Sequence, residues 1–205
     1  MCYYFNKGVD FMIYHFFCKK CNNSLVYNDE SQTKKICRCK FCGHDNKILD
    51  ISYKDNESAP LSNLFPHKFG VDGVTCQSME SFIQSLRVEN EMIQRQICQN
   101  YSGYMAYKMR LSLPDWRKTG YVYWRGRKIL RDSKEYDELM TKAYYELCSQ
   151  NFVFRYCLYN HKDEILFHTI GCTDKTETLL TQQEYISQLE ILIELFELQN
   201  YIRVF

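Results

Sequence analysis

The stretch QSMESFIQSLR (residues 77–87) predicts a helix with an apolar stripe and, beside it, a polar one. The apolar positions recur at i, i+3, i+4 and i+7, the spacing of one buried helix face. They are Met79, Phe82, Ile83 and Leu86. Glu80, Gln84 and Arg87 line the edge of that face. Because the helix dipole also favours an acid in the first turn, Glu80 by itself fits either a functional site or a simple helix start.

The composition predicts a folded chain with an uneven charge distribution. A length of 205 residues accommodates one domain of ordinary size and a small appendage. The chain is 45% hydrophobic and rich in tyrosine and phenylalanine, which excludes a disordered protein. The net charge of +1 excludes neither an anionic ligand nor a neutral one. Between residues 108 and 131, however, eight basic residues accompany a single acid, whereas the C-terminal stretch is acidic.

The N-terminus indicates the compartment. MCYYFNKGVDFMIYHFF lacks the basic leader of a signal peptide, and its apolar residues are interrupted by polar ones. No stretch approaches the roughly 18 apolar residues of a membrane-spanning helix. We therefore expect a cytoplasmic, reducing environment and no membrane partner. There, 11 cysteines predict metal ligands and buried thiols instead of disulfides.

Two C-x-x-C knuckles, CKKC and CKFC, indicate a metal site. Each pair can bind one ion at a tight turn, and two pairs complete the tetrahedral four-sulfur shell of a structural zinc. The predicted ligands are Cys18, Cys21, Cys39 and Cys42. Cys37 is an alternative to Cys39, and Gly43 suits a left-handed turn after the second knuckle. Such a module binds nucleic acid, binds protein or only stabilises the N-terminus.

The cysteines and a polar stretch divide the chain into three parts. Residues 1–53 are predicted to form a small β zinc-ribbon module, residues 54–60 a linker, and residues 61–205 the main domain. The predicted fold class is mainly α with minor β structure, preceded by the zinc-ribbon module.

Local signals place several elements of the main domain. Apolar residues at helical spacing predict a helix that begins at Ser133. Thr181 and Glu184 have the spacing of a capping box at the start of the last helix. Asp72-Gly73, between β-branched and aromatic residues, predicts a hairpin turn.

Further candidates for a site lie outside the 77–87 helix. Each has a structural alternative, because tryptophans commonly fill cores, a histidine can be a hydrogen-bonded core residue, and charged runs are commonly solvated. They are Ser62, Asn63, Trp116, Trp124, His168, Asp174 and Glu177.

In order and spacing these segments resemble the NADAR superfamily of YbiA-like N-glycosidases. PLSNLFPHKFGVDGVTCQSMESFIQSLRV is similar to the family's entry segment, a Ser-Asn loop followed by an extended piece and a helix of the form S-x-E-x-x-x-Q-x-x-K. YWRGRKILRDSKEYDELMTKAYYEL, FRYCL and LFHTIGCTDKTETLLTQQEYISQL resemble a branch found in bacteria, phages and large viruses. The resemblance covers roughly residues 59–195. Two features differ, because Arg87 replaces the helix lysine and GCTDKTET replaces a C-terminal tryptophan- and glycine-rich acidic motif.

The resemblance implies a mainly helical N-glycosidase. Characterised branches cleave phosphoribosyl-linked intermediates of riboflavin synthesis or remove ADP-ribose from guanine. By resemblance, Ser62, Asn63, Glu80 and Gln84 occupy family motif positions. Breaking a ribose C–N bond requires a carboxylate near the anomeric carbon and a donor for the leaving nitrogen. We expect Glu80 to be that carboxylate, and Asp174 to be a second catalytic acid or to bind the ribose.

The remaining candidates are expected to bind the substrate. Arg87 suits a phosphate, because a guanidinium binds phosphate oxygens bidentately. Gln84 suits a ribose hydroxyl or the attacking water, and Trp124 or Trp116 suits a stacked base. The predicted substrate-binding residues are Ser62, Asn63, Gln84, Arg87, Trp124, His168 and Glu177. We expect no organic cofactor.

A function of a different class fits the same residues. A zinc-ribbon protein could bind a nucleotide or nucleic acid without hydrolysing it, and the basic segment 108–131 with its tryptophans favours that reading. Affinity for nucleic acid falls steeply with salt, whereas hydrolysis of a small ligand should tolerate it. The expected partner is a nucleotide-like small molecule or an ADP-ribosylated nucleic acid.

Overall fold

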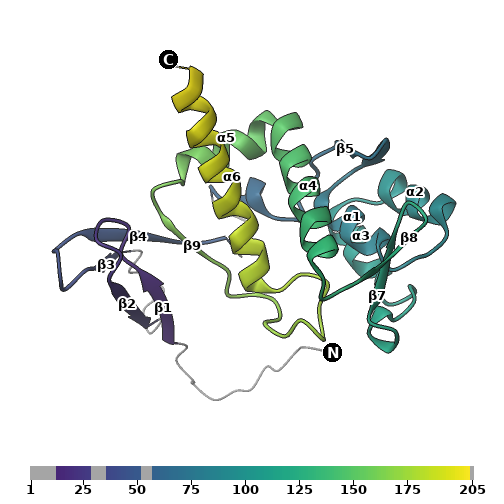
Figure 1. Ribbon diagram of the computed structural model, residues 1–205, viewed down its shortest axis with the longest axis horizontal. Helices are drawn as coiled ribbons and strands as arrows, with labels where there is room; N and C mark the ends of the chain where they lie inside the picture. Colours follow the sequence, from purple (N-terminus) through teal and green to yellow (C-terminus); the bar gives the residue numbers. More distant parts are fainter. Residues whose placement is uncertain (1–12, 29–35, 52–56, 204–205) are drawn as a thin grey trace.

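Figure 1 shows the computed structural model of the chain, which describes residues 13–28, 36–51 and 57–203. These ranges contain six α-helices and nine short strands. The fold mixes helices with small sheets, so the expectation of a mainly α chain with minor β structure is wrong in its proportions. Strands of three to six residues are too short to reveal themselves by alternation in the sequence.

The cysteine-rich segment is built from two small antiparallel pairs. β1 (Ile13–Phe17) pairs with β2 (Ser24–Asn28). β3 (Ile36–Arg38) pairs with β4 (Asp45–Asp50). These strands lie at one end of the molecule, on the left of Figure 1.

A parallel pairing joins this segment to the main body. β4 pairs along its other edge with β9 (Ile165–Phe167), and Ile48 lies opposite Ile165 in that register. A small apolar cluster spans the same junction. Its buried members are Cys18, Leu25, Cys39, Ile48, Ile165 and Phe167. The predicted module and the predicted main domain therefore share a sheet and a core.

The predicted Asp72-Gly73 turn is confirmed. After a short 3-10 turn η1 (Ala59–Leu61), β5 (Phe69–Val71) and β6 (Val74–Cys76) form an antiparallel hairpin. Asp72 and Gly73 have φ values of 49° and 74°, as a type I′ turn requires.

The 77–87 stretch forms helix α1 (Met79–Ser85), and every residue of it is buried. Ser78 caps it reciprocally, because its hydroxyl accepts from the Ser81 N–H while the Ser81 hydroxyl accepts from the Ser78 N–H. The chain then restarts as α2 (Glu91–Asn100) and α3 (Gly103–Met109).

A second hairpin follows the 3-10 turn η2 (Trp116–Lys118). β7 (Tyr121–Trp124) pairs with β8 (Arg127–Leu130) around a turn in which Arg125 and Gly126 have φ values of 50° and 73°. The Tyr123 N–H donates to the Leu86 carbonyl at 2.8 Å, which ties this hairpin to the end of α1.

Three further helices complete the body: α4 (Lys134–Gln150), α5 (Phe152–Asn160) and α6 (Gln182–Arg203). The predicted start at Ser133 is confirmed, because its hydroxyl accepts from the backbone of the first turn of α4. α4 and α6 lie side by side in the middle of Figure 1 and pack on each other, with α1 to α3 beyond α4. The inward faces of these helices contribute to the main core.

The predicted capping box at the start of α6 is also confirmed. The Thr181 N–H donates to the Glu184 carboxylate at 2.8 Å, and the Glu184 N–H donates to the Thr181 hydroxyl at 3.1 Å. In the part of the chain that the structure describes, no helix combines the length and apolar character needed to cross a bilayer.

Candidate functional site

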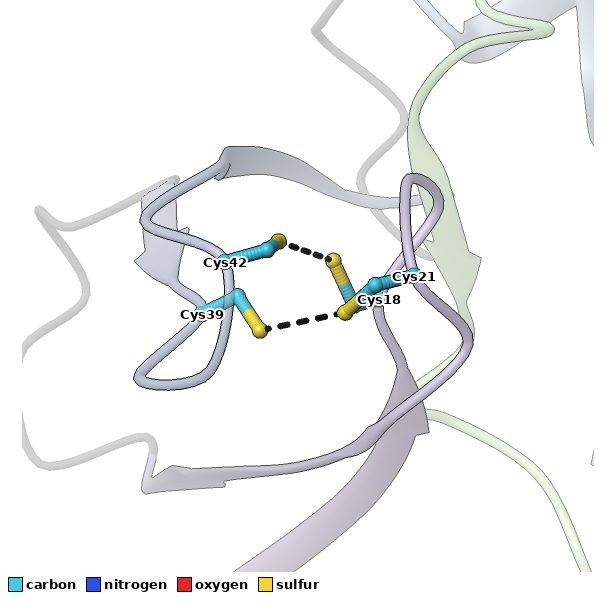
Figure 2. Close-up of side chains that lie close together, drawn as sticks. All are labelled: Cys18, Cys21, Cys39 and Cys42. Carbon is cyan, nitrogen blue, oxygen red and sulfur yellow. Dashed lines mark hydrogen bonds between the residues drawn. The ribbon is translucent and has the colours of Figure 1, made fainter.

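Four cysteine sulfurs converge at the N-terminal end of the molecule (Figure 2). Cys18 Sγ lies 3.7 Å from Cys42 Sγ, and Cys21 Sγ lies 3.6 Å from Cys39 Sγ. All four sulfurs lie within 4.8 Å of one another. A tetrahedral ion with bonds of about 2.3 Å to sulfur would separate the sulfurs by about 3.8 Å. The cluster therefore has the dimensions of a four-sulfur metal centre.

The two knuckles use the same backbone turn. The Asn22 N–H donates to the Cys18 carbonyl at 2.9 Å, and the Gly43 N–H donates to the Cys39 carbonyl at 2.8 Å. Asn22 and Gly43 have φ values of 55° and 72°, the left-handed conformation that glycine and asparagine adopt most readily. Gly43 was expected there, and Asn22 is its counterpart in the first knuckle.

Amide groups surround the sulfurs. Buried Asn46 donates to Cys18 Sγ at 3.6 Å, and Asn23 donates to Cys21 Sγ at 3.2 Å. Burial raises the pKa of Cys18, but the backbone N–H groups of Cys21 and Lys20 and the Asn46 amide outweigh it and lower this pKa to about 6. Cys18 thus favours the thiolate, the form that binds metals. At Cys42 the His44 backbone N–H lowers the pKa, but burial and hydrogen bonds with the neighbouring thiols outweigh it and raise this pKa to about 12.

The structure places Cys39, and not Cys37, in the sulfur cluster. Cys39 is buried within the sulfur cluster, whereas the Cys37 thiol lies outside it and donates to the Val26 carbonyl at 3.9 Å. Burial raises the pKa of Cys37, with Cys39 and Cys18 acting in the same direction, so this thiol stays protonated.

A second polar site is centred on α1. The Glu80 and Gln84 side chains are only 8% and 5% exposed. Gln84 Nε2 donates to Glu80 Oε1 at 2.8 Å. Burial raises the pKa of Glu80, and the Gln84 hydrogen bond, Arg87 and Arg110 oppose that rise. The polar stripe therefore forms one enclosed cluster at the edge of the core.

The loop before α1 is held against this cluster. The Asn63 carbonyl accepts from the Glu80 N–H at 2.9 Å, and Asn63 Oδ1 accepts from the Tyr144 hydroxyl at 2.7 Å. The Tyr185 hydroxyl donates to the Leu61 carbonyl. Ser62 acts locally, because its hydroxyl accepts from the Leu64 N–H at 3.2 Å.

Two tyrosines that were not predicted as site residues hold the loop before α1. Tyr144 on α4 is fully buried, Tyr185 on α6 is 3% exposed, and their ring centroids lie 6.1 Å apart. A buried tyrosine hydroxyl normally has a hydrogen-bond partner, and this rule is the signal that could have attached both residues to a polar site.

Two polar atoms of the cluster lack a protein partner. Among the described residues, Gln84 Oε1 and Arg87 Nε are buried without any hydrogen bond. Such groups are rare and costly in native proteins. One is an acceptor and the other a donor, so a ligand with a hydroxyl and an acceptor oxygen would satisfy both.

Charged residues extend the site from Arg87 towards the C-terminal loop. Burial lowers the pKa of Arg87, and Arg117 and Arg110 act in the same direction while Asp115 and Glu80 oppose them. Arg117 binds Asp115 at 2.7 Å and Glu177 at 2.8 Å. Glu177 is thus exposed but attached to this network through Arg117.

Trp124 lies in the core and not on a ligand-binding surface. Its side chain is fully buried, its indole N–H donates to Asp72 at 2.8 Å, and Phe82 packs on it with ring centroids 5.0 Å apart. The expectation that Trp124 stacks on a substrate base is therefore corrected, because alternation along β7 turns this ring into the core. Trp116 is likewise buried.

Asp174 and His168 belong to the loop between β9 and α6. The Asp174 carboxylate accepts from the Thr176 N–H at 2.8 Å and from its hydroxyl at 2.7 Å, and it is exposed. No hydrogen bond or ion pair among the described residues joins Asp174 to Glu80. The His168 ring packs edge-on to Tyr185 at 5.3 Å, and burial lowers its pKa while Asp50 opposes that shift.

His168 also lines a groove of about 1300 Å³ between the cysteine-rich segment and α6. One wall carries Lys19 and Lys20, and the other carries Glu190 and Glu194. The groove joins the two parts of the molecule without including Glu80.

Comparison with known proteins places this geometry in a family. The model of the family described as bacteriophage protein GP30.3 matches residues 55–194, more than half of the chain. The chain belongs to this family. Residues 13–51, which hold the cysteine cluster, precede the matched region.

A relative and a solved structure support the assignment. An uncharacterized 17.1 kDa protein of Enterobacteria phage T4, from the Gp30–rIII intergenic region, is 36% identical over 137 residues, which cover 66% of this chain and 89% of the relative. The NMR structure of Escherichia coli YbiA matches with a TM-score of 0.54 at 16% identity, covering 80% of this chain and 94% of YbiA. The YbiA-like fold expected from the NADAR resemblance is confirmed.

Proposed function

We propose that this GP30.3-family protein is an N-glycosidase that hydrolyses the ribose–base C–N bond of a nucleotide-like substrate. The observation that carries the proposal is the enclosed Glu80–Gln84 pair beside two polar atoms that lack a protein partner. The NADAR resemblance supports two substrate classes, phosphoribosylated intermediates of riboflavin synthesis and ADP-ribosylated guanine.

The chemistry follows from the environment of Glu80. Burial raises its pKa, which makes the carboxylate a stronger base towards a water molecule. Glu80 takes a proton from that water as the water oxygen bonds to the anomeric carbon. The C–N bond breaks, its electron pair leaves with the base, and the proton passes from Glu80 to the departing nitrogen. The negative carboxylate also stabilises the positive charge that develops on the sugar.

Gln84 and Arg87 then have distinct tasks. Gln84 holds Glu80 through its amide N–H, and its buried Oε1 is available to a ribose hydroxyl. Arg87 Nε is available to an acceptor oxygen of the substrate. Asn63 orients the start of α1 through its carbonyl.

The test is incubation of the full chain with ADP-ribosylated guanosine, as nucleoside and within DNA, and with a phosphoribosylaminopyrimidine, followed by mass spectrometry of the released base. We expect release from one substrate and at least a 100-fold loss in Glu80→Gln, about the contribution of a general base. Glu89→Gln is the matched control, since Glu89 is exposed just beyond α1. Release that survives in Glu80→Gln would refute the assignment of Glu80.

A second candidate function, binding of single-stranded nucleic acid without hydrolysis, is favoured by the surface of α3 and β7–β8. Tyr104 and Tyr107 stack with ring centroids 6.0 Å apart, Lys108 lies 4.8 Å from the Tyr104 ring, and Lys128 lies 4.2 Å from the Tyr121 ring. In the described residues no carboxylate pairs with Lys108 or Lys128. Tyr104 is exposed and Tyr107 and Tyr121 are half-buried, so tyrosine rings beside lysines without a described ion pair suit stacked bases and phosphates. Steeply salt-dependent binding of oligonucleotides with no base release would favour this function.

We propose that the four-cysteine centre holds zinc in a structural role. Four sulfur ligands at tetrahedral separations match the closed sites that zinc prefers. A closed shell leaves no position for a substrate, so the metal would stabilise the knuckles and, through β4 and β9, the loop that follows β9.

A further inference from the structure

We propose that Arg110, together with Arg87, forms a subsite for a phosphoryl group of the substrate beside Glu80. The inference deepens the proposed N-glycosidase function and rests on it for the identity of the site. The residues that would recognise the anion are two guanidinium groups from different elements, and neither forms an ion pair with a carboxylate among the described residues.

Arg110 is held in place without a carboxylate. It ends α3, and its guanidinium carbon lies 3.8 Å from the centre of the Tyr107 ring. None of the ion pairs among the described residues includes Arg110. A guanidinium stacked on a ring keeps its N–H edge free, and that edge matches two oxygens of a phosphate.

α3 cannot move away from the site easily. The Gly103 N–H at its start donates to the Ser78 hydroxyl at 3.0 Å, the same hydroxyl that caps α1. α1 and α3 also pack on each other. Arg110 therefore has a defined position relative to Glu80 and Arg87.

Arg87 supplies the second guanidinium. Its Nε is buried without a partner among the described residues, so this donor awaits an acceptor. Arg110 lowers the pKa of both Arg87 and Glu80, as expected of a cation close to each. Glu80 and Asp115 offset part of the repulsion between these cations, and a bound anion would offset it further.

Arg117 gives the contrast within the same network. It is bound by Asp115 at 2.7 Å and by Glu177 at 2.8 Å, so the protein already neutralises it. Arg87 and Arg110 remain for a ligand. Two guanidiniums fit a tetrahedral phosphoryl dianion, and its attachment to a ribose would place the sugar next to Glu80 and Gln84.

The experiment is calorimetric titration of the full chain with ribose 5-phosphate, ribose and inorganic phosphate. We expect ribose 5-phosphate to bind, ribose to bind at least tenfold more weakly, and inorganic phosphate to compete. Arg110→Gln should weaken ribose 5-phosphate binding at least tenfold. Arg127→Gln is the matched control, since it removes an equal charge from an exposed residue of β8 that pairs with Glu135, and it should change the affinity less than twofold.

Two further variants keep the test decisive. Arg110→Lys keeps the charge but loses the planar guanidinium that can bind two phosphate oxygens. Tyr107→Leu keeps Arg110 but removes the ring on which its guanidinium stacks. Each variant should weaken binding severalfold while its circular dichroism spectrum stays unchanged. Equal affinity for ribose and ribose 5-phosphate, or equal losses in Arg110→Gln and Arg127→Gln, would overturn the subsite. If no substrate releases its base but binding still depends on Arg110, the subsite stands and the hydrolytic function fails.

Discussion

At Glu80, burial and its polar neighbours act on the carboxylate in opposite directions. Burial raises the pKa, while the Gln84 amide, Arg87 and Arg110 lower it, and burial is the larger effect. The protonated form is thus favoured in the folded protein relative to the unfolded chain. A buried carboxylate of this kind costs stability near neutral pH, as functional groups often do.

This cost predicts a pH-dependent effect of Glu80→Gln. A raised folded pKa means that the stability from Glu80 is present below its ordinary pKa of 4.5 and is lost as the pH rises through the folded value. We expect Glu80→Gln to melt at a higher temperature than the native sequence near neutral pH, and the difference to disappear below pH 4.5. Thermal melts followed by circular dichroism across pH measure it. A constant difference at every pH would contradict the burial argument.

Tyr144 is the residue by which α4 reaches the loop before α1. Its hydroxyl donates to Asn63 Oδ1 at 2.7 Å from a fully buried position. We expect Tyr144→Phe to lower the free energy of unfolding by about 1–2 kcal/mol, because the Asn63 oxygen loses its donor. Urea denaturation measures the change. The neighbouring Tyr145 is 39% exposed, so Tyr145→Phe should stay within about 0.5 kcal/mol of the native protein.

On the scale of elements, the position of α3 depends on a glycine. Gly103 has a φ of 51°, and a Cβ built on it would lie 2.4 Å from the Leu64 carbonyl oxygen. α3 thus approaches the loop that contains Ser62 and Asn63 more closely than a residue with a side chain at position 103 would allow. This contact, like the Ser78 hydroxyl shared by α1 and α3, aligns the elements of the site.

Gly103→Ala should therefore destabilise the protein by about 2–5 kcal/mol, the sum of left-handed strain of about 1–2 kcal/mol and overpacking of about 1–3 kcal/mol. Gly73→Ala separates the two contributions, because Gly73 has a φ of 74° but a Cβ added there would meet nothing within 4 Å. Strain alone predicts a loss of about 1–2 kcal/mol there. Equal losses in the two variants, measured by urea denaturation, would show that the close approach is unimportant.

The secondary-structure elements also show which features a local sequence pattern can predict. The Ser133 start, the Thr181–Glu184 capping box and the Asp72-Gly73 turn were predicted correctly, because each depends on residues two to four positions apart. The stretch GYVYWRGRKI (residues 120–129) is compatible from its sequence with an extended segment or with the end of a helix. In the structure it forms most of the β7–β8 hairpin. Its turn contains Arg125 in a left-handed conformation, where arginine carries no signal of a turn.

On the scale of the whole molecule, the cysteine cluster is coupled to the body through β4 and β9. Asp50 at the end of β4 accepts from the Thr169 N–H at 3.3 Å and from its hydroxyl at 2.5 Å, next to His168. The Ile51 N–H donates to the Phe167 carbonyl at 3.0 Å. The segment that holds the cysteine cluster therefore supports the start of the loop that carries Asp174 and Glu177.

Ligand replacement should distinguish the two candidate cysteines. Cys39→Ser is expected to lower the zinc content well below one ion per chain and to lower the melting temperature, because structural zinc contributes directly to folding. Cys37→Ser should keep the full zinc content, since Cys37 lies outside the cluster. Elemental analysis of the purified proteins measures both. Loss of zinc in Cys37→Ser alone would reverse the assignment.

Removal of the metal should also change hydrogen exchange outside the two cysteine knuckles. A chelator is expected to speed hydrogen exchange at the Ile51 amide, whose bond joins β4 to β9. Amides in the middle of α4 report on the main core and should exchange at an unchanged rate. Faster exchange throughout α4 would mean that the metal supports the whole core instead of this junction.

By itself, the sequence determined the features that short spacing encodes. The knuckles, the helix caps, one hairpin turn and the polar stripe of α1 follow from residues close together along the chain, and the family resemblance follows from their order. The tertiary structure decided the contacts between distant residues, which include Tyr144 with Asn63 and β4 with β9. It also decided the burial of Trp124 and the charge effect of Arg110 on the pKa of Arg87. The physical reason is that such contacts form only when the whole core packs, so no local pattern of residues specifies them.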